Sequence, residues 1–251
     1  MRIAMTRSRS IRLAGATLRT VVLFCLSFIV LYPVLYLLSM AFRNPIDLLD
    51  PSVIWIPNVL TLATITKVGS AIAYGSTLGS SLLFAGVSSF LSLATCSLTG
   101  YGFARFRFRG SRVLFGLLLF SIVVPAQTIA IPLFQQLRFF DFFSLGRLLA
   151  PIMGYTPSLN LYNTPAAVYL PALFGAGIRS SLYIYIFRQF FKGLPQDLED
   201  AANIDGAGFL KTFLRIIVPT ATPPYLVVAI LSFIWYWNDV LWIPLFYPKY
   251  L

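Results

Sequence analysis

Long stretches of this chain carry no charged residue. Five of them, at positions 21–42, 69–104, 113–137, 148–178 and 216–238, are each at least 22 residues long. A helix of about 20 apolar residues is long enough to cross a bilayer. We therefore predict five membrane-spanning helices, near residues 21–42, 76–98, 113–134, 166–188 and 220–242. The first stretch exceeds the apolar core of a signal peptide, about 7–15 residues, so we expect it to be retained as an anchor.

Residues that break helices interrupt three of these predicted spans. Proline occurs in the third, fourth and fifth spans, at positions 125, 171, 223 and 224. Membrane helices tolerate proline better than soluble helices do. The fourth span also contains Arg179, and three arrangements stay open there. The arginine could be a functional group inside the bilayer, the helix could start near Gly177 so that Arg179 reaches outward, or the span could be broken around residues 175–177.

The composition indicates a lipid environment. Hydrophobic residues make up 58% of the chain and charged residues 11%, with a mean hydropathy of +0.82. A soluble globular chain carries about 25% charged residues. We therefore predict an all-α, polytopic membrane protein, with a basic tail at residues 1–19 and a transmembrane domain at residues 20–251.

The net charge of +11 is distributed unevenly around the predicted spans. If the spans alternate in direction, 13 of the 19 basic residues fall on one side, namely Arg2, Arg7, Arg9, Arg12, Arg19, Arg105, Arg107, Arg109, Arg112, Arg188, Lys192, Lys211 and Arg215. The positive-inside rule makes this side the cytoplasm, so we expect a cytoplasmic N-terminus. Residues 101–112 interleave aromatic residues with arginines, as RNA-binding segments do. A belt at the cytoplasmic membrane surface explains that pattern more readily, and we predict no nucleic-acid partner.

The chain has no histidine and only two cysteines. The lack of histidine excludes Ser-His-Asp and Cys-His catalysis and every metal site with a histidine ligand. Cys25 and Cys96 lie in different predicted spans and give no disulfide signal. We therefore predict no catalytic residue, no metal site, no cofactor-binding residue and no enzyme activity for this chain.

Half of the eight acidic residues gather between positions 197 and 205, in the segment between the fourth and fifth predicted spans. Pro195 suits the first turn of a helix, where its missing N–H costs nothing. The carboxylates of Asp197, Glu199 and Asp200 then fall in that turn and favour its positive dipole end. We therefore predict that a short helix begins here.

Small residues shape the rest of this acidic segment. Ala201 and Ala202 share one face with two leucines at helical spacing, and the alanines make that face shallow enough for another surface to approach closely. Asp205 and Gly206 form a turn in which the glycine can adopt the left-handed conformation that ends a helix. The carboxylates could be catalytic or form only a solvated face. We favour a third interpretation, a docking element for a cytoplasmic protein.

The same segment resembles the EAA loop of permease subunits from binding-protein-dependent ABC importers. That motif reads EAA---G---------I-LP, and it matches without a gap at Asp200, Ala201, Ala202, Gly206, Ile216, Val218 and Pro219. Asp for Glu and Val for Leu are the two departures. Residues 101–105, 187–191 and 237–239 are similar to the carbohydrate-uptake branch, which contains the maltose-type and glycerol-phosphate-type permeases.

The resemblance implies a type I permease fold of six helices in a prokaryotic cytoplasmic membrane. It also implies a second homologous permease subunit, two cytoplasmic ATPase subunits that bind ATP and magnesium, and an extracytoplasmic solute-binding protein. The loop at residues 192–219 would couple the ATPase to the membrane helices through Glu199, Asp200, Ala201, Ala202, Asp205, Gly206, Ile216 and Pro219. The family's sixth helix would lie beyond residue 251, so we expect the sequence to be a partial one.

Residues that could contact a solute are less distinctive, because aromatic residues near the end of a span are commonly interface anchors. The candidates are Gln127 in the third span and Trp235, Trp237 and Asn238 in the fifth. We predict a sugar or oligosaccharide as the solute, with glycerol phosphate or a polyol as the alternative. A secondary transporter without an ATPase is an alternative of another class. It would need carboxylates within its spans, and only Asp239 lies near one.

Overall fold

The computed structural model describes residues 2–47, 50–51, 53–141, 151–152, 154 and 158–248. The regular structure within these residues is helical, apart from one isolated bridge between Phe140 and Leu159. The chain divides into two compact units, Met1–Leu78 and Gly79–Leu251. Residues 142–150, 153 and 155–157 lie outside the described part of the chain.

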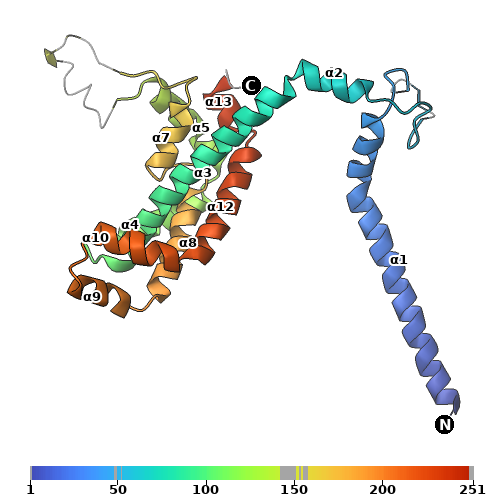
Figure 1. The fold of residues 1–251 in the computed structure, drawn as a ribbon, viewed down its shortest axis with the longest axis horizontal. Coiled ribbons are helices and arrows are strands. Elements are labelled where there is room, and N and C mark those ends of the chain that lie inside the picture. The colour runs from blue at the N-terminus through green and yellow to red at the C-terminus, as the bar shows by residue number, and fades with distance from the viewer. Residues whose placement is uncertain are drawn as a thin grey trace. The chain divides into compact units, whose positions relative to one another are not determined.

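The first unit contains two helices, the loop between them and the start of a third helix (Figure 1). Helix α1 spans Arg2–Ala41 and α2 spans Ala63–Ala71. The basic tail that we predicted at residues 1–19 therefore begins the same helix that contains the first span. Helix α1 includes Pro33 without ending there.

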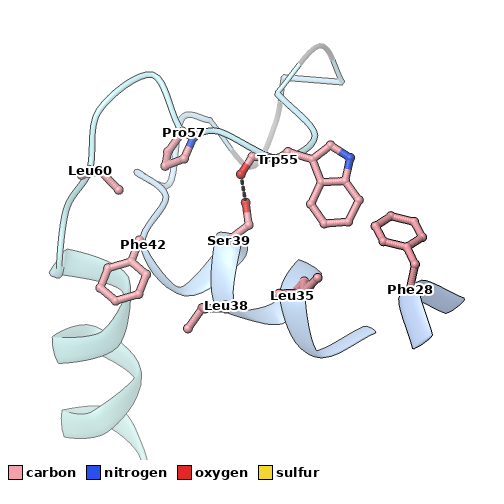
Figure 2. Close-up of a pocket in the computed structure, with 8 residues that line it drawn as sticks. All are labelled: Phe28, Leu35, Leu38, Ser39, Phe42, Trp55, Pro57 and Leu60. Carbon is pink, nitrogen blue, oxygen red and sulfur yellow. Dashed lines mark hydrogen bonds between the residues drawn. The ribbon is translucent and has the colours of Figure 1, made fainter. Parts of the chain in front are cut away.

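Two buried charged residues hold the loop of the first unit. The Arg43 guanidinium donates to Ser39 Oγ at 3.0 Å and to the Ile54 carbonyl, while Asp47 accepts a hydrogen bond from the Asn58 amide at 3.0 Å. The Ser39 hydroxyl donates to the Trp55 carbonyl at 2.6 Å (Figure 2). The loop thus covers an apolar pocket at the end of α1, lined by Phe28, Leu35, Leu38, Ser39, Phe42, Trp55, Pro57 and Leu60.

The second unit contains the remaining helices and most of the buried core. Their bounds are α3 Tyr74–Arg105, which begins in the first unit, α4 Ser111–Val123, α5 Ala126–Arg138, α7 Ala166–Leu173, α8 Ser180–Gly193, α9 Asp197–Ile204, α10 Phe209–Thr212, the π-helix η2 Phe213–Ile217, α11 Val218–Thr220, α12 Thr222–Trp237 and α13 Trp242–Phe246. Helices α3, α8 and α12 lie side by side (Figure 1), and Ser88, Ser92 and Ser232 are fully buried in them. Small residues let membrane helices approach closely, which accounts for the serines at these positions.

The third predicted span, at 113–134, is not one straight helix. Helix α4 ends at Val123, and α5 begins after Pro125 at an angle of 110°. Proline has no N–H to donate and disfavours the helical conformation in the residue before it. Val124 accordingly is extended, with ψ of 123°.

The fourth span is broken, which was one of the three arrangements left open. Helix α7 ends at Leu173 and α8 starts at Ser180, with left-handed residues at Gly175 (φ +72°) and Arg179 (φ +57°) between them. The Leu173 carbonyl, freed by the break, accepts a hydrogen bond of 2.7 Å from Thr95 Oγ1 of α3. A continuous helix at 166–188 is therefore wrong, and the neighbouring helix satisfies the broken backbone.

The helix at the fifth predicted span, 220–242, is shorter than predicted: α12 covers Thr222–Trp237. It follows the segment Phe209–Thr220 at a bend of 82°. Within the described residues, two helices are individually long and apolar enough to cross a membrane, Gly15–Ala41 and Tyr74–Arg105, and the number rises to four if each bent pair forms one span. The fold class agrees with the predicted polytopic helical protein.

Candidate functional site

The acidic segment forms the predicted helix, α9, with Asp197, Glu199 and Asp200 in its first turn. Its end is closed by two hydrogen bonds, from the Ala207 amide to the Ala202 carbonyl at 2.9 Å and from the Gly206 amide to the Asn203 carbonyl at 3.1 Å. Gly206 has φ of +71°. This is the Schellman arrangement, in which a left-handed residue reverses the chain and satisfies the last carbonyls. The predicted helix end at Gly206 is confirmed, and the three carboxylates lie in the first turn as predicted. Pro195 precedes that turn instead of lying in it.

The two alanines of α9 do not lie in equivalent environments. Ala202 is 3% exposed, whereas Ala201 is exposed. Consecutive helical positions differ by about 100° around the axis, so one alanine packs on the chain and its neighbour does not. The expected shallow face shared by Ala201 and Ala202 is therefore wrong. Asp200, Asp205 and Gly206 are exposed together with Ala201.

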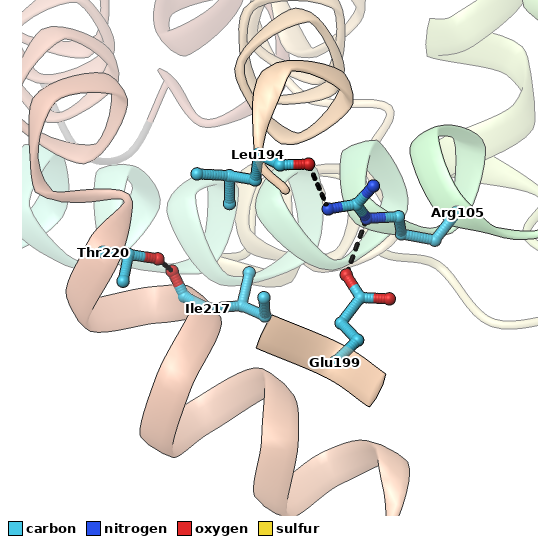
Figure 3. Close-up of polar contacts among 5 residues, drawn as sticks. All are labelled: Arg105, Leu194, Glu199, Ile217 and Thr220. Atoms are coloured by element: carbon cyan, nitrogen blue, oxygen red, sulfur yellow. Dashed lines mark hydrogen bonds and ion pairs between the residues drawn. The ribbon is translucent and has the colours of Figure 1, made fainter. Parts of the chain in front are cut away.

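Glu199 points toward the end of α3 rather than into solvent (Figure 3). Its Oε1 lies 2.6 Å from Nε of Arg105, and the two side chains are 14% and 12% exposed. Arg105 Nη2 also donates to the Leu194 carbonyl at 2.9 Å. One guanidinium thus holds the residue that follows α8 and the first turn of α9 (Figure 3).

The return segment from α10 to α11 packs by aromatic residues on the end of α3. The Tyr101 ring lies 5.6 Å from Phe209, 5.1 Å from Phe213 and 5.5 Å from Phe191 of α8, measured between ring centroids. Ile217 is fully buried in this cluster.

The two motif residues of the return segment are less enclosed. Ile216 is only half-buried, and Pro219 is exposed. The Thr220 hydroxyl donates to the Ile217 carbonyl at 2.8 Å just before the bend into α12 (Figure 3).

The predicted solute residues lie on two elements. Gln127 is exposed on α5, while Trp235 and Trp237 are exposed in the last turn of α12. Asn238 follows that turn, and its Nδ2 donates to the Ile234 carbonyl at 3.0 Å. Trp237 stacks on Phe233 with the ring centroids 5.7 Å apart.

A contact that the sequence did not predict joins the break in the fourth span to α12. The Arg179 guanidinium lies 4.5 Å from the centre of the Trp235 ring, a distance typical of a cation–π interaction. Arg105 is a functional candidate that the sequence analysis missed, since no local pattern relates it to Glu199.

This arrangement defines a helical membrane protein with a short acidic helix that folds back on the core. The chain belongs to the family of binding-protein-dependent transport system inner membrane components, whose sequence pattern matches residues 96–248. The family membership identifies the chain as an ABC transporter permease, as the resemblance of the acidic segment implied.

Curated relatives in several bacteria are permease proteins. The chain is 31% identical over 225 residues to the arabinooligosaccharides transport system permease protein AraQ of Halalkalibacterium halodurans, covering 86% of this chain and 70% of that protein. It is 28% identical to the trehalose transport system permease protein SugB of Mycobacterium tuberculosis, covering 84% of this chain and 68% of the relative. These relatives are transport permeases and not enzymes.

A solved structure shares the fold. It is a bacterial ABC transporter involved in the import of the acidic polysaccharide alginate, which superimposes with a TM-score of 0.64 over 92% of this chain and 73% of that chain. The sequence identity is 22%, so this likeness bears on the fold alone.

Proposed function

We propose that this chain is a permease subunit of an ATP-driven importer in a prokaryotic inner membrane, and that it forms half of the translocation pathway for a sugar or oligosaccharide. The relatives named for arabinooligosaccharides and trehalose support the solute class. A relative named for the uptake of osmoprotective compounds, 30% identical, makes an osmoprotective compound the second candidate solute. The partners are a second homologous permease, two ATPase subunits that carry ATP and magnesium, and an extracytoplasmic binding protein.

In this proposal, α9 couples the ATPase to the membrane helices. The observation that carries it is the division of α9 into two sides. Glu199 and Ala202 face the chain itself, while Asp200, Ala201 and Asp205 are exposed and available to a partner. Ile216 and Pro219 belong to the return segment, which connects α9 to α12.

The test is retention of the ATPase by this subunit when both are produced with the second permease. Ala201→Glu adds charge and bulk to the exposed side of α9 without touching the core, and we expect it to abolish copurification of the ATPase while the two permeases stay together. Ser111→Glu is the matched control, because it adds the same charge at the start of α4, where the helix dipole favours it. Undiminished binding of the ATPase by the Ala201→Glu variant would exclude α9 as the docking element.

Arg179 and Trp235 support a place for the solute in the same subunit. Helix α8 has 14 residues, so Ser180 lies about 20 Å from the end that leads into α9. An exposed arginine at that depth favours an aqueous path or a protein partner over lipid. The guanidinium offers donors to hydroxyl or carboxylate oxygens, and the indole offers an apolar face to C–H groups.

Substitution of Arg179 and Trp235 distinguishes contact with the solute from a purely structural role. We expect Arg179→Gln and Trp235→Phe to raise the solute concentration needed for half-maximal uptake about tenfold, through loss of roughly 1.4 kcal/mol of binding, with normal assembly. Val240→Ala, at an exposed residue beyond α12, is the control. A half-maximal concentration unaltered by both substitutions would remove these residues from the pathway.

A further inference from the structure

We propose that the Arg105–Glu199 ion pair makes α3 a second route by which movement of α9 reaches the membrane helices. The inference rests on the proposed function, since it concerns how the coupling helix acts on its own chain. Along the backbone, α9 is connected backward to α8 and forward through α10 to α12. The ion pair adds a connection to α3 that chain order does not supply.

The geometry gives Arg105 one partner in the linker that follows α8 and a second partner in the first turn of α9. Its Nε meets Glu199 Oε1 at 2.6 Å, and its Nη2 meets the Leu194 carbonyl at 2.9 Å. Leu194 directly follows α8, and Glu199 is the third residue of α9. Both side chains are almost enclosed, so water and salt screen the attraction less than they would at an open surface. The linker therefore cannot move away from α3 without breaking the pair.

The part of α3 that carries Arg105 is firmly packed. A Cβ built on Gly100 would lie 2.7 Å from the Phe187 Cβ of α8, so the two helices touch backbone to side chain there. Tyr101 is 3% exposed among the rings of Phe191, Phe209 and Phe213. Because a close-packed region passes on displacement instead of absorbing it, a pull on the guanidinium moves this end of α3.

A different role would leave the same contacts in place. The pair could fix the position of α9 during assembly and transmit nothing afterwards. Transmission affects the amount of solute moved per ATP hydrolysed, whereas fixing during assembly affects only the amount of intact complex. The amount of solute moved per ATP hydrolysed, measured on assembled complexes, therefore distinguishes the two roles.

The experiment uses the complete importer in proteoliposomes, with the binding protein and a solute that the wild-type importer accumulates. Glu199→Gln removes the charge and keeps the shape of the side chain, and the exchange Arg105→Glu with Glu199→Arg restores an opposite pair. We expect Glu199→Gln to lower solute moved per ATP about tenfold, a size usual for coupling between sites, and the exchange to recover most of the loss. Arg107→Gln, at an exposed residue two positions from Arg105, is the matched control that should keep the wild-type ratio.

A distance measurement tests the same inference and does not depend on how much of each variant complex is produced. Spin labels are placed at Arg107→Cys and Asn203→Cys, both exposed, in a chain with Cys25→Ser and Cys96→Ser. With the ion pair intact, the label distance should be the same in the ATP-free and the vanadate-trapped importer, and Glu199→Gln should make it change between the two states. A distance that changes with the pair intact, or an unchanged transport ratio in Glu199→Gln, overturns the inference. An importer with the native pair that shows no ATP-dependent uptake would instead contradict the proposed function.

Discussion

Gly100 sets the distance between α3 and α8 at the end of the core nearest α9. A Cβ at this position would lie 2.7 Å from the Phe187 Cβ, 3.0 Å from the Ile184 carbonyl oxygen and 3.1 Å from the Arg188 amide nitrogen. Two of these three neighbours are backbone atoms, which cannot turn away as a side chain can. Any residue with a Cβ therefore has to push the helices apart.

We expect Gly100→Ala to destabilise the subunit by about 1–3 kcal/mol, the usual cost of overpacking a well-packed core. Gly102→Ala is the matched control on the same helix, because its Cβ would meet only the Phe106 ring, at 3.9 Å, and alanine is the better helix former. The measurement is the melting temperature of the detergent-purified protein. Similar melting of the two variants would show that the contact yields without cost.

Local patterns predicted the backbone around Glu199 but not the partner of its side chain. The acidic first turn and the glycine at the helix end are signals within a few residues, and the helix forms between them. Arg105 belongs to a helix that precedes Glu199 by more than 90 positions, and nothing in the spacing of either residue relates the two. Long-range pairing of this kind depends on how α3 and α8 pack, which a single sequence does not state.

At the scale of helices, the uncharged stretches of the sequence predicted where the apolar segments lie. They overestimated how far each segment continues as one unbroken helix. Helix α3 extends beyond the predicted 76–98 in both directions, and its flanking residues contain no proline that would end it. The third and fourth spans contain prolines and glycines whose effect depends on neighbours. Pro33 lies inside α1 and Pro132 inside α5 without ending either helix, whereas α5 begins only after Pro125.

The break between α7 and α8 shows why the neighbours decide. The Thr95 hydroxyl donates a hydrogen bond to the freed Leu173 carbonyl. Gly177 packs closely against Ala172 and the hydroxyl of Tyr236. Tyr236 is itself held by a hydrogen bond of 3.1 Å to Ser92. A break in a membrane helix is stable when such partners satisfy the exposed backbone. The glycines mark a place where the helix can open, and α3 and α12 determine that it does.

At the scale of the whole chain, α1 presents an apolar surface that the loop of the first unit covers only in part. The most apolar 18 residues of its segment Gly15–Ala41 include no buried residue. Exposed apolar side chains occur all around it, among them Phe24, Ile29 and Val30. A helix that is apolar on every side is stable in lipid or against another membrane protein. This agrees with a multi-pass membrane permease.

The orientation of the chain is a prediction from charge that labelling can test. The exposed arginines after α3 and the exposed acidic residues of α9 should lie in the cytoplasm, because the positive-inside rule places Arg107, Arg109 and Arg112 there. The loop between α1 and α2 should then lie on the opposite side. We test both sides with single cysteines at exposed positions, in a chain with Cys25→Ser and Cys96→Ser.

We expect a membrane-impermeant maleimide to label Val59→Cys in intact spheroplasts and to label Arg107→Cys and Ile204→Cys only after the membrane is opened. All three positions are exposed, so a difference in labelling reports the side of the membrane and not burial in the fold. The two cytoplasmic positions lie on different elements, one after α3 and one at the end of α9, and they must agree because Arg105 and Glu199 hold those elements together. Labelling of Arg107→Cys from outside would invert the predicted orientation. It would also place α9 where no cytoplasmic ATPase could reach it.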